Sequence, residues 1–293
     1  MKEIFLDIGE LGWSMYLSAH LRWRKEHIMS NWAVMTLPGR DCLYEGMVDK
    51  IFHAHWKHKE NQLLRDRDCF GFYGLPDYKL RAYFNAKVPA GYQIPESQPL
   101  GAFSREEIFK GKMIFKPYPY KDKSLNNLSK SIAMKEILVF PRYRDAKPFC
   151  VKNLPKTFYT NLVSKLCDEF PKYIIRTMGT REGAYNITYN HELGWVKRPN
   201  YMNHIGKTPT IQALIDRCQC AIGAVGSQSA PPKLMLLQNV PTFMIGHTRK
   251  RHQEEENWGK AKCGFWEIGL DDYNKFYSWE CIDEIVKFFK EVK

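Results

Sequence analysis

The sequence lacks a hydrophobic run long enough to cross a membrane, and it lacks a secretory signal. A membrane-spanning helix needs about 18 or more apolar residues in succession, and no stretch of the 293-residue chain approaches this length. The N-terminal segment, MKEIFLDIGELGW, carries charges and a glycine within its apolar part, which indicates a first strand and not a signal peptide. These absences predict a cytoplasmic protein without a transmembrane segment.

Cysteine pairs at metal-binding spacing are also missing. The eight cysteines are scattered, and the one close pair, Cys218 and Cys220, is separated by a single residue. Structural zinc sites use C-x-x-C or paired histidine spacings, and neither occurs. Alternation along a strand places His53 and His55 on one face, but no third ligand is evident, so a basic surface is the favoured interpretation. We predict reduced thiols, no metal site and no bound cofactor.

Acidic residues are in deficit. The chain has 44 Lys and Arg against 32 Asp and Glu, which gives a formal net charge of +12. A basic balance favours an anionic partner, which can be nucleic acid, an anionic lipid surface or a phosphorylated substrate. Charge alone does not choose between these partners, or between them and a plain lysine-rich surface.

Apolar runs that end at Gly or Pro alternate with helical patterns in the first half. Strands are expected at 3–8, 31–37 and 47–55, with a helix at 13–27. Strand–helix–strand repetition is typical of a parallel sheet with crossover helices. Prolines, glycines and aromatics are dense from Asp66 to Ser131, so loops and short elements are expected there.

The second half repeats this α/β pattern. Thr157 is expected to cap one helix, and Thr208, followed by Pro209, is expected to cap another. The other expected elements are strands at EILVF (136–140), KYIIRTM (172–178), CAIGAV (220–225) and VPTFMIG (240–246), a helix at PPKLMLLQ (231–238) and a terminal helix at 281–292.

We therefore predict an α/β protein with two domains. The expected domains are 1–130 and 131–293, with a polar interdomain linker at 121–131. Whether the terminal helix at 281–292 returns to the first domain is left open.

A Gly-Ser turn separates a strand from a helix in AIGAVGSQSAPPKLMLLQNVPTFMIGH, which begins at Ala221. The turn comprises Gly226, Ser227, Gln228 and Ser229. Small residues, hydroxyl groups and free backbone N–H groups at a helix start are suited to bind an anion, and Lys233 adds a positive charge one turn into the helix. The alternative is an ordinary α/β loop with a serine N-cap.

Two arginines follow the first strand of the second half. Arg142 and Arg144 carry forked guanidinium groups, which match the geometry of phosphate oxygens. Contact with the phosphate groups of a ligand is the favoured interpretation for at least one of them, and an ordinary basic loop is the alternative.

The Gly-Ser turn and its surroundings resemble heptosyltransferase-like glycosyltransferases of the GT-B fold. That family has an apolar strand, a Gly-x-Asp-Ser-Gly-Pro turn, a His, an apolar helix and a VPT strand. Ser229 and Pro231 keep the pattern, whereas Gln228 stands in place of the Asp and Lys233 in place of the His. The segment HIGKTPTIQALIDRC (204–218) is similar to the motif upstream of this signature.

A third similarity lies at the N-terminus, where DIGELGWS (7–14) resembles the family's turn after the first strand. Glu10 occupies the position of the acidic residue proposed as the catalytic base of the family. The resemblance implies two Rossmann-like domains that face a cleft, with the acceptor on the side of 1–130 and the nucleotide sugar on the side of 131–293. It also implies that Glu10 takes the proton from an acceptor hydroxyl, while the Gly-Ser turn, Lys233 and the two arginines hold a donor diphosphate. Asp7 is the local alternative as base, although a structural role is expected for it.

The resulting expectation is an inverting glycosyltransferase that uses a nucleoside-diphosphate sugar without a metal, since no D-x-D triplet stands at a strand end. The acceptor is left open between a glycolipid at a membrane face, as a peripheral contact, and modified DNA, with Arg249 and Arg251 on the path of an anionic acceptor. A nucleotide-sugar epimerase of the same fold and a non-catalytic nucleic-acid-binding protein are the alternative functions.

Overall fold

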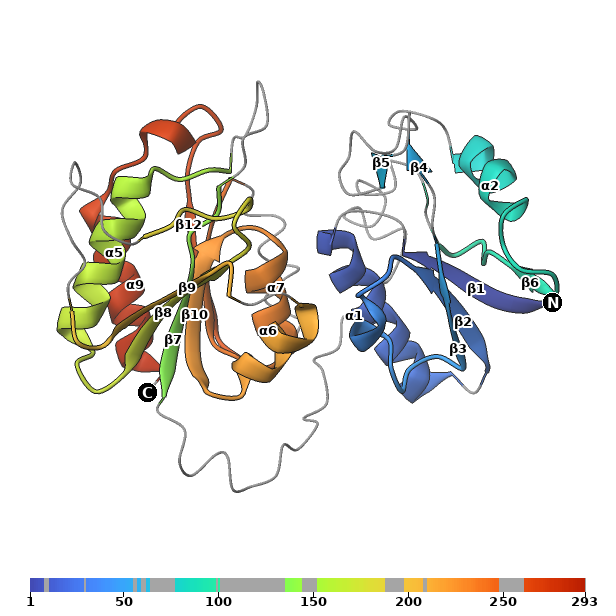
Figure 1. Cartoon of the computed structure of the whole chain (residues 1–293), viewed down its shortest axis with the longest axis horizontal. Helices are drawn as coiled ribbons and strands as arrows, with labels where there is room; N and C mark the ends of the chain where they lie inside the picture. Colours follow the sequence, from blue (N-terminus) through green and yellow to red (C-terminus); the bar gives the residue numbers. More distant parts are fainter. Residues whose placement is uncertain are drawn as a thin grey trace. The chain divides into compact units, whose positions relative to one another are not determined.

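A computed structural model divides the chain into two compact units, unit 1 (Met1–Tyr118) and unit 2 (Pro119–Lys293) (Figure 1). The described residues are 1–7, 11–28, 30–54, 57–58, 62–63, 77–98, 100, 135–143, 152–187, 198–207, 210–247 and 261–292. The predicted linker at 121–131 lies outside this part of the chain, and each unit is described by itself. No helix among the described residues is long and apolar enough to cross a membrane.

Unit 1 is built on a parallel sheet with strand order β3-β2-β1-β6. Its elements are β1 (Lys2–Asp7), α1 (Leu11–His27), β2 (Trp32–Thr36), η1 (Asp41–Leu43), β3 (Lys50–His53), β4 (Lys57–His58), β5 (Gln62–Leu63), α2 (Asp77–Asn85) and β6 (Tyr92–Gln93). The first three strands and α1 confirm the predicted strand–helix–strand pattern. The buried apolar runs of β1 and β2 explain it, because strands covered on both faces need no alternation.

Helix α2 falls where only loops and short elements were expected. Leu80 and Phe84 are four residues apart, so they lie on one face of the helix, and both are buried in the core of unit 1 beside Ile4 and Met35. The prolines that follow obscure this short apolar pair in the sequence. The helix therefore depends on tertiary packing more than on its own nine residues.

Unit 2 is a six-stranded parallel sheet with strand order β12-β11-β10-β7-β8-β9. Its elements are β7 (Glu136–Phe140), α5 (Lys156–Glu169), β8 (Ile174–Gly179), β9 (Tyr201–Ile205), α6 (Ile211–Cys218), β10 (Ala221–Ser227), α7 (Ala230–Leu237), β11 (Thr242–Gly246), β12 (Cys263–Glu267), η4 (Tyr273–Lys275) and α9 (Trp279–Glu291). Helices α5 and α9 lie on one side of this sheet, with α6 and α7 on the other (Figure 1).

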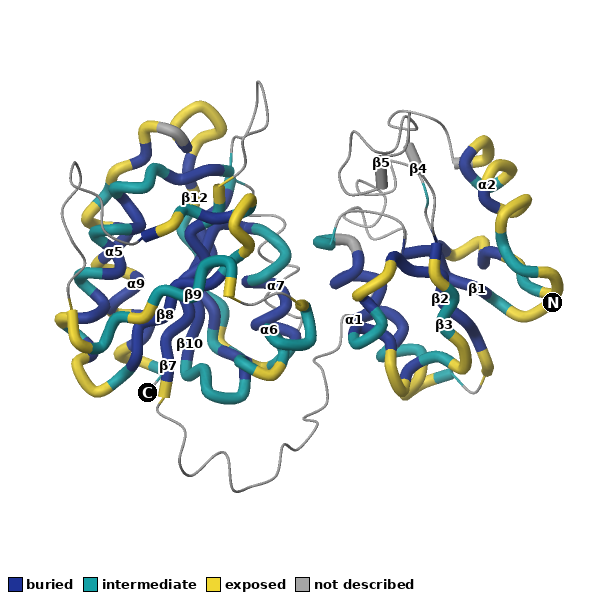
Figure 2. Tube along the Cα trace, in the orientation of Figure 1, coloured by how far each residue is buried: buried dark blue, intermediate teal, exposed yellow. Residues whose placement is uncertain are grey.

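The terminal helix α9 contributes to the core of unit 2. Ile282, Ile285 and Phe289 recur at helical spacing and are buried in one cluster with residues of α5 and of the sheet. A Cβ added at Gly223 of β10 would lie 2.4 Å from the Phe289 ring, so this strand has a glycine where the helix approaches it. The burial pattern agrees, since the strands and inner helix faces are buried and the outer turns are exposed (Figure 2).

The helix starts in unit 2 differ from two of the predicted caps. Helix α5 begins after Pro155 without a side-chain cap, and Thr157 is its second residue, so the expected Thr157 cap is wrong. Helix α6 is capped by Thr210, whose hydroxyl accepts a hydrogen bond from Ala213 N (3.1 Å). The predicted cap at Thr208 and Pro209 lies outside the described residues.

His20 makes the stability of unit 1 dependent on pH. Burial and the nearby Arg24 charge lower the pKa of His20 from 6.5 to about 4, because both disfavour the imidazolium. Between these values the unfolded chain binds the extra proton, so stability falls as the pH is lowered from 6.5 towards 4 and rises again with pH. A shift of this size corresponds to about 3 kcal/mol.

We therefore expect His20→Gln to flatten the dependence of the urea midpoint of unit 1 on pH between 4 and 6.5. His27→Gln is the matched control, since His27 lies exposed on the same helix. An equal pH dependence in wild type and His20→Gln would show that His20 is not the group responsible.

Candidate functional site

The candidate site of unit 2 lies where the strand order of the sheet reverses. From β7 the chain proceeds outward through β8 and β9, and it then returns to place β10 on the other side of β7. In open α/β sheets, ligands bind outside the carboxyl ends of the strands at such a switch point. The residues that follow β7 and β10, including Arg142 and Ser229, therefore lie at the edge where a ligand is expected.

The segment after β7 is held by backbone hydrogen bonds to the turn that follows β8. Arg142 forms an isolated antiparallel bridge with Ala184. On its two sides, Tyr143 N donates to the Gly183 carbonyl (3.0 Å) and Tyr185 N donates to the Pro141 carbonyl (2.7 Å). The backbone of Arg142 is thus fixed beside the switch point, with its side chain half-buried.

Gly226 serves the close packing of strand β10 against its neighbours. A Cβ at this position would lie 2.9 Å from the Phe140 Cβ on β7 and 3.1 Å from the Pro232 Cγ on α7. A side chain would push the helix away from the strand, so the glycine brings the start of α7 close to the sheet.

Ser227 and Gln228 are buried at the end of β10. Gln228 N continues the ladder by donating to the Ile245 carbonyl of β11 (2.8 Å). Ser227 is fully buried and shares its face of the strand with Val225, which packs in the core with α5 and α9. These two side chains are thus part of the interior of the turn, whereas the half-buried Ser229 lies closer to solvent.

Ser229 is the N-cap of α7 but makes no capping hydrogen bond. An N-cap hydroxyl normally accepts from the N–H of the second or third helical residue. In α7 these residues are Pro231 and Pro232, and proline has no N–H. Among the first three helical residues Ala230 alone therefore has an N–H group, and the Ser229 hydroxyl lacks its usual helical partner.

Lys233 lies one turn into α7 and is buried, with its backbone N donating to the Ser229 carbonyl (3.4 Å). A cation near the N-terminus of a helix opposes the helix dipole. An anion bound at this end would offset both the dipole and the lysine charge.

Tyr159 and Tyr273 were not singled out in the sequence, yet they belong to this edge. Both hydroxyl groups are buried, and so is the Ser227 hydroxyl, which lies near that of Tyr159. Burial raises the pKa of Tyr159, although the nearby Ser227 hydroxyl and Arg142 charge oppose the change. In the sequence, Tyr159 belongs to the apolar stripe of its helix. No local pattern therefore predicts that it lies near Ser227 and Arg142.

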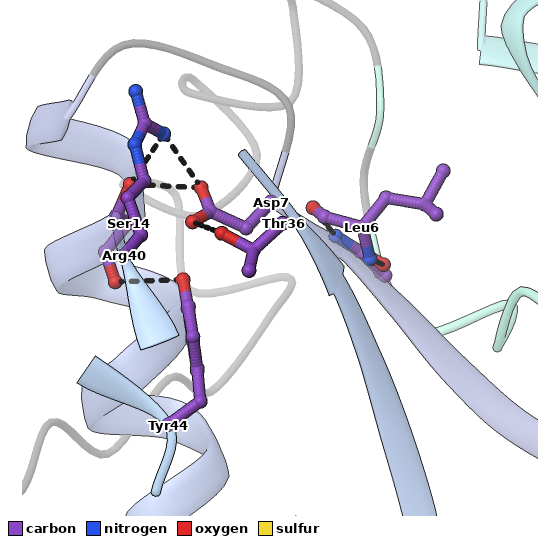
Figure 3. A network of polar contacts seen from close by, with 7 residues as sticks. Leu6, Asp7, Ser14, Thr36, Arg40 and Tyr44 are labelled. Carbon is purple, nitrogen blue, oxygen red and sulfur yellow. Dashed lines mark hydrogen bonds and ion pairs between the residues drawn. The ribbon is translucent and has the colours of Figure 1, made fainter. Parts of the chain in front are cut away.

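In unit 1 the strand order reverses at β1, which has β2 on one side and β6 on the other, so the switch point lies at the carboxyl end of β1. Asp7 ends this strand and is buried in a polar network (Figure 3). Ser14 Oγ donates to Asp7 Oδ1 (2.8 Å), Thr36 Oγ1 donates to Asp7 Oδ2 (2.6 Å), and Arg40 Nη1 forms an ion pair with Asp7 Oδ1 (3.1 Å). Both carboxylate oxygens are thus engaged, which agrees with a structural role for Asp7.

Four predicted site residues lie outside the described part of the chain: Glu10, Arg144, Arg249 and Arg251. The structure places Arg142 and the Gly226–Ser229 turn at one edge of one sheet. Of the histidines weighed as metal ligands, His53 forms a hydrogen bond with Asp41 Oδ1 (2.6 Å). No group of three or more His, Cys, Asp or Glu that could hold a metal occurs among the described residues.

Comparison with known proteins finds similarity in structure alone. No protein family matches the sequence, and no curated protein matches it. The ADP-heptose lipopolysaccharide heptosyltransferase II of Escherichia coli is similar over 100% of this chain and 98% of its own, with TM-score 0.55 and 12% identity. A family 9 glycosyltransferase from Veillonella parvula is similar over 99% and 97%, with TM-score 0.56 and 12% identity.

The E. coli heptosyltransferase WaaC with ADP gives a TM-score of 0.54 at 8% identity, over 100% of this chain and 99% of its own. Each match spans both units, and identities this low establish the fold alone. They confirm the predicted resemblance at this level. The chain has the GT-B fold of the heptosyltransferase-like glycosyltransferases, with two Rossmann-like α/β domains.

Proposed function

We propose that this protein is a glycosyltransferase that moves a sugar from a nucleoside-diphosphate donor to a hydroxyl group of an acceptor. The reaction is a single displacement with inversion, in which Glu10 takes the proton from the acceptor hydroxyl. The donor diphosphate is held by unit 2 without a metal. The GT-B fold supports the reaction class, and the chemistry at the switch point of unit 2 supports the location of the donor.

The observation that carries this proposal is the start of α7. Ser229 occupies the N-cap, but Pro231 and Pro232 offer it no N–H to accept from. A hydroxyl that caps no helix can donate to a phosphoryl oxygen, and a helix N-terminus favours negative charge. Arg142, after the neighbouring strand β7, supplies a forked cation at the same edge of the sheet.

These groups have a catalytic consequence as well as a binding one. When the bond between the sugar and the donor breaks, negative charge develops on the departing diphosphate. Positive and hydrogen-donating groups that are already in place stabilise this charge more strongly in the transition state than in the ground state. Arg142, Ser229 and Lys233 are the residues proposed for this task.

A binding screen on the full chain tests the donor class. Sugars linked to ADP, UDP, GDP and dTDP are added in turn, and the unfolding temperature is measured, because a ligand bound by the folded state alone raises it. ADP-linked sugars come first, since two of the similar structures name ADP or ADP-heptose. We expect a concentration-dependent rise with one nucleotide class. If none of the sugars and none of the free nucleoside diphosphates shifts the transition, the proposed function is wrong.

The combined change Ser229→Ala and Lys233→Ala is expected to weaken nucleoside-diphosphate binding about tenfold or more, since charge-assisted hydrogen bonds contribute roughly 1.5–3 kcal/mol each. Isothermal titration calorimetry measures the affinity. The matched control is Ser278→Ala, because Ser278 does cap its helix by accepting from Cys281 N (3.1 Å).

The two serines should therefore behave in opposite ways. Ser278→Ala is expected to lower stability by about 1 kcal/mol without changing nucleotide affinity. Ser229→Ala alone is expected to leave stability nearly unchanged and to weaken binding. Unchanged affinity in the folded double variant would remove the start of α7 from the donor site.

The acceptor is proposed to be anionic, because the chain carries a net charge of +12. A glycolipid with acidic groups and modified DNA share this property. Binding to vesicles of anionic lipid and to duplex DNA at rising salt separates the two, since DNA affinity falls steeply with salt. DNA binding that does not respond to any nucleotide sugar would favour a non-catalytic nucleic-acid-binding protein.

A further inference from the structure

We propose that Asp7, Ser14 and Arg40 are positioning residues that fix both ends of the three-residue connection between β1 and α1. Strand β1 ends at Asp7 and helix α1 begins at Leu11, so Glu10 lies in this connection. The inference rests on the proposed function insofar as Glu10 is the base. Its geometric part, the fixing of both ends, stands on the described residues alone.

The first element of this clamp joins the strand to the helix across the connection. Ser14 lies in the first turn of α1, and its Oγ donates to Asp7 Oδ1 (2.8 Å) (Figure 3). Arg40 binds both partners at once, because its Nη1 donates to Asp7 Oδ1 (3.1 Å) and to Ser14 Oγ (2.8 Å). The residue before the connection and the first helical turn after it are therefore held in one arrangement.

The second element holds the end of β1 within its sheet. On one side Thr36, the last residue of β2, donates to Asp7 Oδ2 (2.6 Å). On the other side β6 pairs with Lys2 and Glu3, and further along β1 the Gln98 side chain bonds the backbone of Leu6. Its Oε1 accepts from Leu6 N (2.8 Å), and its Nε2 donates to the Leu6 carbonyl (2.7 Å). The last two residues of β1 are thus tied on both sides.

The third element is the turn that delivers Arg40. Gly39 has φ +85°, a left-handed conformation that favours glycine, and Arg40 N donates back to the Leu37 carbonyl (3.3 Å). This tight turn follows β2 and places the Arg40 guanidinium beside Asp7. The Asp7 side chain is 1% exposed and that of Arg40 11%, so removal of either charge would leave the other one desolvated.

A buried network of this kind does more than stabilise, because it specifies geometry. If the end of a strand made only exposed hydrogen bonds, its geometry relative to the next helix could vary. A buried carboxylate that must satisfy three donors has one arrangement that meets them all, and any displacement leaves a polar group unpaired at a high free-energy cost. The clamp therefore fixes the end of β1 relative to the start of α1, and through these two ends it is proposed to act on a base in the connection.

The experiment compares two serines of α1 in the full chain. Ser14 and Ser18 lie one turn apart and are both fully buried. The Ser14 hydroxyl bonds Asp7 across the connection, whereas Ser18 Oγ donates to the Leu43 carbonyl (2.7 Å), away from β1. Ser14→Ala and Ser18→Ala each remove one buried hydroxyl from the same helix, and the free energy of unfolding, measured for both, separates a general loss of stability from a local one.

The first readout is hydrogen–deuterium exchange of peptides that cover residues 8–13. We expect Ser14→Ala to raise the exchange rate there about tenfold, and Ser18→Ala to leave it close to that of the wild type. Equal exchange in the two variants would overturn the proposal. This readout needs no substrate, so it decides the geometric part even if no nucleotide sugar is ever turned over.

The second readout is the rate of sugar transfer or of slow donor hydrolysis. We expect Ser14→Ala to lower kcat about tenfold with the KM for the donor unchanged, because misplacement of a reacting group affects the chemical step. Ser18→Ala should lower neither. Faster exchange with an unchanged kcat would overturn the positioning role, whereas an inactive wild type would refute the proposed function and leave the exchange result to stand.

Discussion

Glu10→Gln is expected to lower sugar transfer by about 10²–10⁴-fold, the range typical of general-base catalysis, while the affinity for the donor stays nearly constant. Glutamine keeps the size and hydrogen bonding of glutamate but cannot take a proton. The donor contacts are proposed for unit 2, so a base in unit 1 should not contribute to them. Turnover of the donor and calorimetric affinity for the nucleotide are measured on the same preparation.

The control for this change is Glu45→Gln, at an exposed glutamate of unit 1. It should leave turnover unchanged. Near-normal turnover in Glu10→Gln would show that the base lies elsewhere, and loss of donor binding would place Glu10 in the nucleotide site. Asp7→Asn tests Asp7 as the alternative base. Because Asp7 is buried and paired with Arg40, we expect this variant to lose stability together with activity, whereas a base would lose activity alone.

Loss of one partner from the buried ion pair of Glu136 and Arg176 is expected to destabilise unit 2 by about 3–5 kcal/mol. The pair joins β7 and β8, and the two side chains are 4% and 5% exposed. Arg176 Nε donates to Glu136 Oε2 (2.8 Å), and Arg176 Nη2 contacts the other oxygen, which Arg217 Nη1 also approaches (3.2 Å). Glu136→Leu would leave the Arg176 charge buried without its carboxylate.

A double-mutant cycle separates the interaction from the burial of its parts. Glu136→Leu together with Arg176→Met should lose much less stability than either change alone, because apolar side chains can replace a buried pair once both charges are gone. The free energy of unfolding of unit 2 is followed by native-state hydrogen exchange at the amides of β7 and β8. Additive losses would contradict this account.

The chain contains a matched surface pair for comparison. Arg198 also binds Asp168 through two nitrogens, at 2.7 and 3.1 Å, but these side chains are 40% and 53% exposed. The hydrogen bond and charge of Arg198 lower the pKa of Asp168. Because water screens an exposed pair, Arg198→Met is expected to cost far less stability than loss of one partner of the buried pair. A large loss there would show that burial is not what distinguishes the two pairs.

The elements that the sequence predicted well are those with a purely local cause. The strands β7, β10 and β11 are apolar runs bounded by Gly, Pro or Ser, and β1 is an apolar run that ends at Asp7. The apolar stripe of α9 follows the helical period. Strand β9 (YMNHI) was missed because Asn203 and His204 interrupt its apolar residues and none of the five is buried, and it exists because β8 pairs with it. Strand β12 (CGFWE) is also an edge strand, and its apolar run is short and only half-buried.

By itself, the amino-acid sequence determined the α/β class, the two halves and the Gly-Ser turn before α7. These depend on hydrophobic period and on the φ and N–H properties of Gly and Pro, which act within a few residues. Only the tertiary structure decided that Arg142 and Ser229 share one edge of the sheet and that Ser227 faces the core. It also decided that both carboxylate oxygens of Asp7 are bonded, by Ser14, Thr36 and Arg40. The physical reason is that strand order and burial arise from contacts between distant segments, which no local pattern encodes.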